Sequence, residues 1–132
     1  MFEKFALETK YNEAINITPQ VREIITKSGI KDGICIVSVP HTTAGLCLHS
    51  FWDPNGWTDM MVQMDRMIPT RVDFKHDSDP PHDASGHVKS ALMNTNMSLI
   101  VKDGDLLFGR SQGILFAEFD GPRSREVFVK VM

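Results

Sequence analysis

The last third of the chain is a succession of four short runs that each have the pattern of a β-strand. They are "MSLIVK" (97–102), "DLLFG" (105–109), "GILFAEF" (113–119) and "REVFVKV" (125–131). Turn-forming residues connect them, at Asp103-Gly104, from Gly109 to Gln112, and in "DGPRS" from Asp120. Many short strands in one small domain favour a layered β architecture.

The first two thirds of the chain add three more strands and three helices. Strands are expected at 4–9, 33–39 and 44–50, and helices at 17–29, 57–69 and 86–94. Thr18 is the expected cap of the first helix, with Pro19 at its first position and Gly29 at its end. Asp83 or Ser85 is the expected cap of the third. The sequence therefore predicts one α+β domain, 1–132: a two-layer β-sandwich of about seven strands with flanking helices, of either Greek-key or mixed-sheet type.

Composition excludes several classes of partner. The formal net charge is -3 at pH 7, which does not favour a broad surface for nucleic acid or anionic membranes. No apolar run approaches the roughly 20 residues that span a bilayer. "MFEKFALETK" alternates and carries acids, unlike a signal peptide, so a cytoplasmic location is expected. Cys35 and Cys47 lie in apolar runs and are expected to be reduced core residues.

Histidine is concentrated in one part of the sequence. All five histidines lie between His41 and His87, and "HDSDPPHDASGH" contains three of them with three aspartates. Neutral imidazole is a common ligand for zinc and similar ions, and catalytic sites combine it with carboxylates and an open position. The spacing does not fit an EF-hand, because His82 stands where that loop requires glycine. The segment is either a metal-binding or catalytic loop or a solvated turn rich in acids.

Two other segments have both a functional and a structural interpretation. "HTTAG" follows a buried strand, so the Thr42 and Thr43 hydroxyls beside an imidazole could hold a phosphate, or could simply belong to a turn that closes a hairpin. The methionines of the second helix, near Trp52 and Trp57, suit either the core or a subunit contact.

Four stretches together resemble the YjbQ-like family, often labelled secondary thiamine-phosphate synthase. They are "HTTAGLCL", the run from His76 to Lys89, "VKDGDLLFG" with Gln112-Gly113, and "FAEFDGPRSREVFV". The resemblance covers almost the whole chain. It implies a compact mixed β-sandwich with flanking helices, a homotrimer, and histidines near a subunit boundary. It also implies a weak transferase activity that joins a pyrimidine pyrophosphate to a thiazole phosphate.

The resemblance also assigns residues. It gives His41, His76 and His87 as ligands of a divalent ion such as zinc, nickel or magnesium. We expect Asp79 to be the proton acceptor, with Asp53 as a second catalytic carboxylate. The expected substrate-binding residues are Thr42, Thr43, Arg110 and Gln112.

The chain also departs from the family pattern. Ser50 replaces a carboxylate, and Arg110-Ser111 replaces Thr-Trp. The sequence thus predicts an enzyme for a small phosphorylated molecule. The alternatives are a non-catalytic trimeric metal- or anion-binding protein and a metal-dependent hydrolase or oxygenase.

Overall fold

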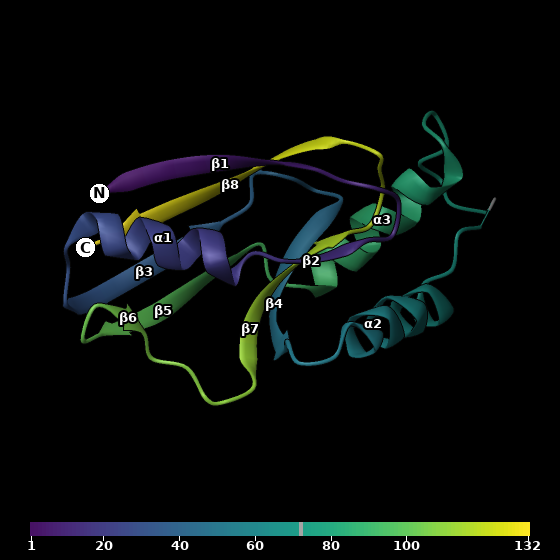
Figure 1. Ribbon diagram of the computed structural model, residues 1–132. Coiled ribbons are helices and arrows are strands. Elements are labelled where there is room, and N and C mark those ends of the chain that lie inside the picture. The colour runs from purple at the N-terminus through teal and green to yellow at the C-terminus, as the bar shows by residue number, and fades with distance from the viewer. Residues whose placement is uncertain (72) are drawn as a thin grey trace.

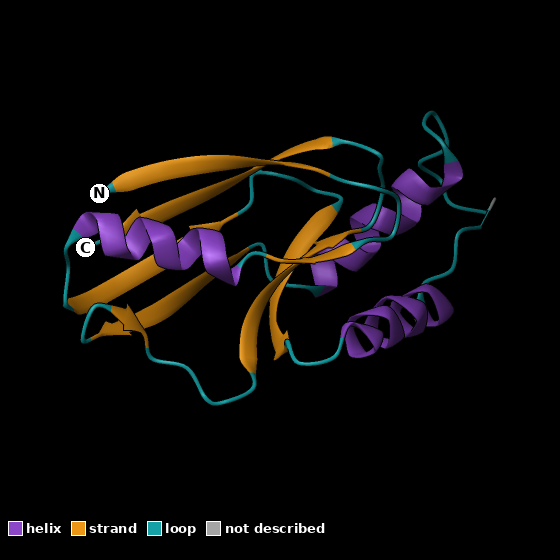
Figure 2. Cartoon of the chain, viewed as in Figure 1, coloured by secondary structure: helices purple, strands orange, loops and turns teal. Residues whose placement is uncertain are grey.

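Two antiparallel sheets form the body of the protein (Figure 1, Figure 2). The computed structural model describes residues 1–71 and 73–132, and within them it has eight strands and three helices. The five-stranded sheet has the order β1 (Phe2–Glu8), β8 (Ser124–Val131), β3 (Asp32–Ser38), β5 (Asn96–Lys102), β6 (Asp105–Leu106). The three-stranded sheet has the order β2 (Ala14–Asn16), β7 (Gln112–Glu118), β4 (Ala44–Ser50).

The main core lies between the two sheets. Along β8, Val127, Val129 and Val131 are buried in alternation with more exposed residues, as expected when one face of a strand points inward. Leu46 of β4 and Phe116 of β7 meet them from the three-stranded sheet. Apolar burial of this kind is the main stabilising contribution to the fold.

Helix α1 (Thr18–Ser28) closes this core with Val21, Ile24 and Ile25. Gly29 ends the helix in the left-handed conformation, with φ of 69°, which only glycine adopts at little cost. The prediction that Thr18 caps the helix is wrong, because Ile17 is the N-cap residue and Thr18 is the first helical residue. The Thr18 backbone N–H is instead satisfied by Asn16 Oδ1 at 3.1 Å.

Helices α2 (Pro54–Met67) and α3 (Pro81–Leu92) lie on the face of the three-stranded sheet that points away from the main core (Figure 1). Met61 is buried there with Ala117 and Phe119, and Met60 and Met64 pack against them. Met61 therefore belongs to a core, as one of the two interpretations predicts, whereas Met60 and Met64 are only partly buried. Helix α3 begins at Pro81, five residues before the predicted start, so neither Asp83 nor Ser85 is its cap.

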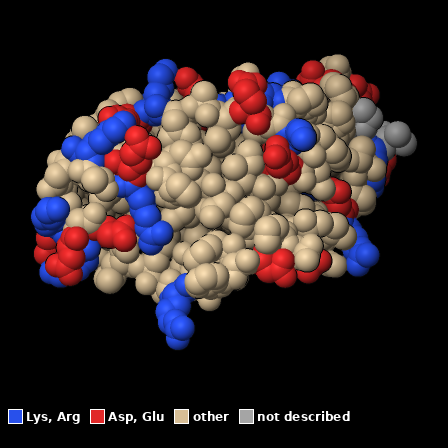
Figure 3. All heavy atoms as spheres, viewed as in Figure 1, with Lys and Arg blue, Asp and Glu red and all other residues tan. Residues whose placement is uncertain are grey.

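The predicted α+β class and the flanking helices are confirmed, and the seven expected strands all form. The short β2 was not predicted. Every strand pair in the described part of the chain is antiparallel, so neither sheet is mixed. None of the described helices is long and apolar enough to cross a membrane. Acidic and basic side chains are interspersed on the face shown in Figure 3.

Candidate metal centre

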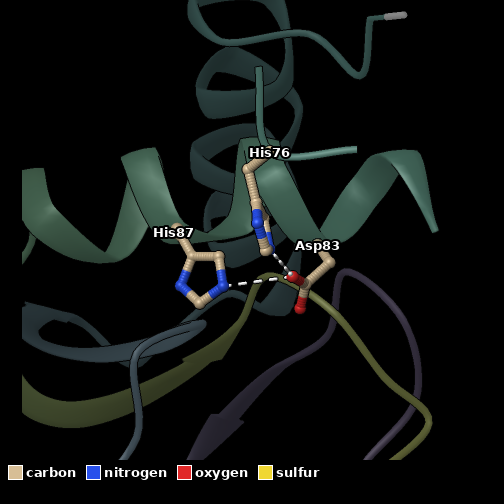
Figure 4. Close-up of side chains that lie close together, drawn as sticks. All are labelled: His76, Asp83 and His87. Atoms are coloured by element: carbon tan, nitrogen blue, oxygen red, sulfur yellow. Dashed lines mark hydrogen bonds and ion pairs between the residues drawn. The ribbon is translucent and has the colours of Figure 1, made fainter. Parts of the chain in front are cut away.

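Three side chains from one short part of the chain converge beside helix α3. His76 comes from the segment that precedes the helix, and Asp83 and His87 come from its first two turns (Figure 4). Residues four apart lie on the same face of a helix, which places Asp83 and His87 together. One ligand atom from each of the three side chains lies within 4.8 Å of the other two.

Helix α3 approaches the end of β7 closely, and a glycine allows this. A Cβ atom on Gly86 would lie 2.9 Å from the backbone oxygen of Phe119, closer than such atoms normally come. Gly86 lies between Asp83 and His87 in the helix, so this contact fixes both side chains against the loop that follows β7. Packing of the helix therefore positions Asp83 and His87, whereas His76 comes from the irregular segment before the helix.

The Asp83 carboxylate is the middle of the cluster. Its Oδ2 atom lies 3.0 Å from Nε2 of His76 and 3.1 Å from Nε2 of His87 (Figure 4). Burial alone would raise the pKa of Asp83. The hydrogen bond from His76 and the charge of His87 outweigh it and hold the pKa below its usual value of 3.8. Asp83 is therefore an anion near neutral pH, and its side chain is only 7% exposed.

The backbone determines which nitrogen of His87 is available. Nδ1 lies 3.1 Å from the carbonyl oxygen of Thr42, which can only accept, so Nδ1 carries the proton. In a neutral imidazole, Nε2 then has a lone pair, and this lone pair faces the carboxylate of Asp83. Two acceptors at 3.1 Å require a positive charge between them, either a second proton on His87 or a metal cation.

The donor set fits a divalent transition ion. Two imidazoles and one carboxylate form a common catalytic zinc set that leaves a position open for water or substrate. Ligand atoms that share a tetrahedral zinc ion lie about 3.3 Å apart, given zinc–ligand distances of about 2.0–2.1 Å. The two separations from Asp83, 3.0 and 3.1 Å, are slightly shorter than this value and are also normal hydrogen-bond distances, and all three ligand atoms lie within 4.8 Å of one another. The Nδ1 contact of His87 with a backbone carbonyl is the outer hydrogen bond typical of metal-bound histidine.

A second polar group lies next to the centre, in the loop after β7. Asp120 accepts from Nε of Arg123 at 2.8 Å and pairs with Nε2 of His82 at 2.8 Å through its other oxygen. Nη2 of Arg123 lies 3.8 Å from Oδ1 of Asp83. The hydrogen bond and the charge of Asp120 raise the pKa of Arg123, so its guanidinium is permanently charged.

Two surface hollows flank His87. One has a volume of about 350 Å³ and is lined by His76 and His87 with Phe74, Lys75 and Val88. The other has a volume of about 480 Å³, and His87 also lines it. Its remaining lining is more polar and comprises Val39, Pro40, His41, Thr42, Ser90, Ala91 and Thr95. A ligand at the centre can therefore extend into an apolar hollow on one side and a polar one on the other.

Of the three predicted metal ligands, the structure brings two together. His76 and His87 are in the cluster, but His41 is not, and its Nε2 accepts the backbone N–H of Glu126 at 2.9 Å. Burial and the charge of Arg125 lower the pKa of His41, which keeps it neutral as this contact requires. In the structure Asp83, and not His41, is the third member of the cluster.

The predicted Asp79 and Thr42 lie close to the cluster. Asp79 Oδ2 is 3.3 Å from Nε2 of His76. Thr42 orients His87 through its backbone carbonyl rather than its hydroxyl. Thr43 is buried, and its Oγ1 accepts from Arg125 at 2.7 Å. Arg125 in turn pairs with the fully buried Glu118, so Thr43 supports an internal ion pair.

The other predicted residues lie elsewhere. β4 pairs with β7 from Ala44–Glu118 at one end to Ser50–Gln112 at the other, and these ends are about 20 Å apart at about 3.3 Å per residue. Arg110 and Gln112 are at the far end, next to Ser50. Asp53 caps helix α2 by accepting the N–H of Asn55 at 2.9 Å. Within one chain, these residues are not part of the centre.

Cysteine chemistry is not favoured at this site. Cys35 and Cys47 are both free. Burial raises the pKa of each thiol to about 11. Both are therefore protonated near neutral pH, when only a thiolate is an effective nucleophile.

Sequence reasoning did not assign Asp83 or Arg123 to the site. The signal for Asp83 was present, because Pro81 suits a first helical position and a helix from that residue puts Asp83 and His87 on one face. Arg123 had no local signal, since it reaches Asp83 across 40 positions of the chain.

Comparison with known proteins identifies the family. The family model of UPF0047 protein YjbQ-like matches residues 3–132. The UPF0047 protein MJ1081 of Methanocaldococcus jannaschii is 40% identical, over 100% of this chain and 94% of its own. The crystal structure of a YjbQ/UPF0047 family protein from Clostridium acetobutylicum is 37% identical with a TM-score of 0.90, over 98% of this chain and 99% of its own. That of a YbjQ-like protein of unknown function from Sulfolobus solfataricus is 28% identical with a TM-score of 0.93, over 99% of this chain and 95% of its own. The names of these relatives state no reaction. The family model, the sequence identity and the fold together show that the chain belongs to the YjbQ-like UPF0047 family.

Proposed function

We propose that the protein is a metal-dependent enzyme that acts on a small phosphorylated molecule. In this proposal the ion is held by Nε2 of His76, Nε2 of His87 and a carboxylate oxygen of Asp83. The observation that carries it is the convergence of two imidazoles on the buried Asp83 carboxylate, with Nδ1 of His87 directed at the Thr42 carbonyl so that its Nε2 faces Asp83. His41, the third ligand expected from the sequence, is replaced in the set by Asp83.

The chain's own residues have distinct tasks in this site. A bound divalent ion would supply Lewis-acid stabilisation of charge on a phosphate oxygen. Asp79, at 3.3 Å from His76, is placed to accept a proton from a ligand bound there. The side chains of Phe74 and Val88 give the first hollow an apolar lining, and Lys75 adds a positive charge to it.

The family resemblance points to a transferase of the thiamine-phosphate synthase type. Such a reaction needs room for a pyrimidine pyrophosphate and a thiazole phosphate at once, and the hollows on the two sides of His87 offer this room. A metal-dependent hydrolase or oxygenase is the second candidate, because two histidines and one carboxylate also serve those reactions.

Metal binding by ligand variants tests the centre directly. We expect the wild-type protein to bind zinc in a calorimetric titration near neutral pH. His76→Ala, Asp83→Asn and His87→Ala should each weaken binding by at least about tenfold, because each removes one donor. His49→Ala is the matched control, since His49 lies near the far end of β4. No zinc or nickel binding by the wild type, or an equal loss in the control, would contradict the proposal.

Turnover separates the enzyme from a binding protein. The zinc-loaded protein should form thiamine phosphate from the two phosphorylated precursors, and a chelator should abolish the product. Hydrolysis of the pyrimidine pyrophosphate without joining would favour the hydrolase. Tight zinc binding with neither product would indicate a non-catalytic metal-binding protein.

A further inference from the structure

Arg123 occupies a defined position beside the metal centre. Its Nε and Nη2 atoms lie 2.8 and 2.7 Å from the same oxygen of Asp120. The Asp120 side chain is only 4% exposed, and His82 holds its second oxygen at 2.8 Å. The guanidinium is therefore fixed along one edge by a buried carboxylate that is itself fixed.

The other edge of the guanidinium is available to a ligand. A guanidinium has five N–H donors in a plane, and in the described part of the chain Nη1 makes no hydrogen bond. The Arg123 side chain is 48% exposed. Its Nη2 lies 3.8 Å from Asp83 Oδ1, too far for a hydrogen bond. The remaining donors therefore lie beside the carboxylate that the proposed ion would share.

The charge of the ligand can be inferred from its two neighbours, the Arg123 guanidinium and the proposed metal ion, which would both be positive. A fixed positive charge this close to Asp83 opposes the binding of a metal cation there, so Arg123 does not serve to retain the ion. The same charge is useful if an anion binds between the ion and the guanidinium. Phosphate oxygens suit this role, because arginine binds them through two parallel N–H donors.

We propose that Arg123 forms an anion subsite of the metal centre, which binds a phosphate or pyrophosphate group of the ligand while an oxygen of that group meets the ion. This assignment rests on the proposed function. Asp120 and His82 are positioning residues, since they act only by holding Arg123. Arg110, expected from the sequence to bind substrate, lies beyond the opposite end of β4, a strand about 20 Å long.

Two titrations of the same variants test the subsite. Zinc-loaded protein is titrated with pyrophosphate, and metal-free protein is titrated with zinc. Arg123→Gln should weaken pyrophosphate binding by about tenfold or more, while zinc binding stays the same or becomes tighter because a repelling charge is gone. Arg123→Lys should recover part of the pyrophosphate affinity. Arg66→Gln, a change of an exposed arginine on α2, is the control and should affect neither titration.

The possible outcomes are distinguishable. If Arg123→Gln weakens zinc and pyrophosphate binding equally, the residue is only structural and the subsite is wrong. If pyrophosphate affinity is unchanged, or falls in Arg110→Gln instead, the assignment is also overturned. If no variant and no wild-type sample binds zinc, the metal centre fails, and pyrophosphate is titrated into metal-free protein. Arg123-dependent binding would then keep the anion subsite, and Arg123-independent binding would reject it.

Discussion

At the scale of single residues, His41 and His87 show how one backbone contact determines what an imidazole can do. His87 donates from Nδ1 to a carbonyl, so its Nε2 is left with a lone pair for a metal. His41 accepts a backbone N–H at Nε2, so the same atom is already occupied. The two residues are identical in chemistry and line one hollow, yet only one is suited to ligation.

The contact of His41 predicts a pH dependence of stability. Burial and Arg125 lower its pKa below the ordinary 6.5, although Glu118 and Glu126 oppose this. A histidine with a lowered folded-state pKa stabilises the fold above pH 6.5, and this contribution is lost as the pH falls through the folded-state value. His41→Gln keeps an acceptor but removes the titration. Its unfolding free energy should therefore fall less than that of the wild type as the pH is lowered from about 7 to 5.

Denaturant unfolding at a series of pH values measures this difference. The informative quantity is the slope of stability against pH and not the stability at one pH, because the substitution also alters packing. Parallel curves for the two proteins would mean that the pKa of His41 does not differ between the folded and unfolded states.

At the scale of elements, the boundary of one helix limited what could be predicted about the site. The Pro80-Pro81 pair interrupts the apolar pattern, so the sequence favours a helix that begins after it, with Asp83 or Ser85 as its cap. In the structure, Pro81 is the first helical residue and Asp83 belongs to the first turn, where it lies beside His76 and His87. The late start predicted for the helix therefore left Asp83 out of the candidate metal ligands.

Strand alternation was the more reliable signal, and its failures have physical reasons. β8 and β3 were predicted because buried β-branched residues recur along them. β2 has three residues, too few to show a period of two. Contacts between distant segments, such as that of Arg123 with Asp83, leave no trace in local pattern. The sequence therefore indicates the layers and most of the histidine loop, but not the loop after β7.

An ion pair joins helix α2 to helix α3. Only Met61 of this helix is buried, and Asp65 reaches the Lys89 ammonium on α3, whose side chain is fully buried. Asp65→Ala leaves that charge buried without its partner. We expect a loss of roughly 2–3 kcal/mol of unfolding free energy, below the roughly 3–5 for wholly buried pairs because Asp65 is partly exposed.

Chemical denaturation of a matched pair of variants tests this role. Asp59→Ala removes an exposed acid from the same helix and should change stability by less than about 0.5 kcal/mol. Equal effects of the two substitutions would show that the contact of Asp65 with Lys89 adds nothing specific to the attachment of α2.

At the scale of the whole molecule, one sheet face stays uncovered. Phe2, Ile34 and Ile100 are 57%, 48% and 59% exposed. Ile34 and Ile100 are register partners on the face of the five-stranded sheet that points away from the core. An antiparallel sheet with one solvated face normally has polar residues there. Here exposed apolar side chains lie among charged pairs such as Lys4 with Glu126, and we expect a further layer to cover the apolar part.

The candidate metal centre does not need that layer. His76, Asp83, His87 and Arg123 all come from one chain, and they lie beside α3 rather than on the outer face of the five-stranded sheet. Within one chain, the length of β4 separates Arg110 and Gln112 from the centre. If either residue contacts the ligand, it must therefore belong to a neighbouring chain. We therefore expect metal binding to persist when assembly is lost.

The family resemblance implies three chains, and we predict that they assemble through this sheet face. Light scattering at micromolar concentration should give a mass near three times 14.9 kDa. Ile100→Lys places a charge in the middle of the apolar face, so it should shift the mass to that of a single chain while zinc affinity stays the same. Met67→Lys, which alters another exposed apolar residue at the end of α2, should leave the assembly intact.

A monomeric wild type would contradict the trimer. A trimeric Ile100→Lys variant would place the interface elsewhere, and loss of zinc together with the assembly would show that a neighbouring chain completes the centre.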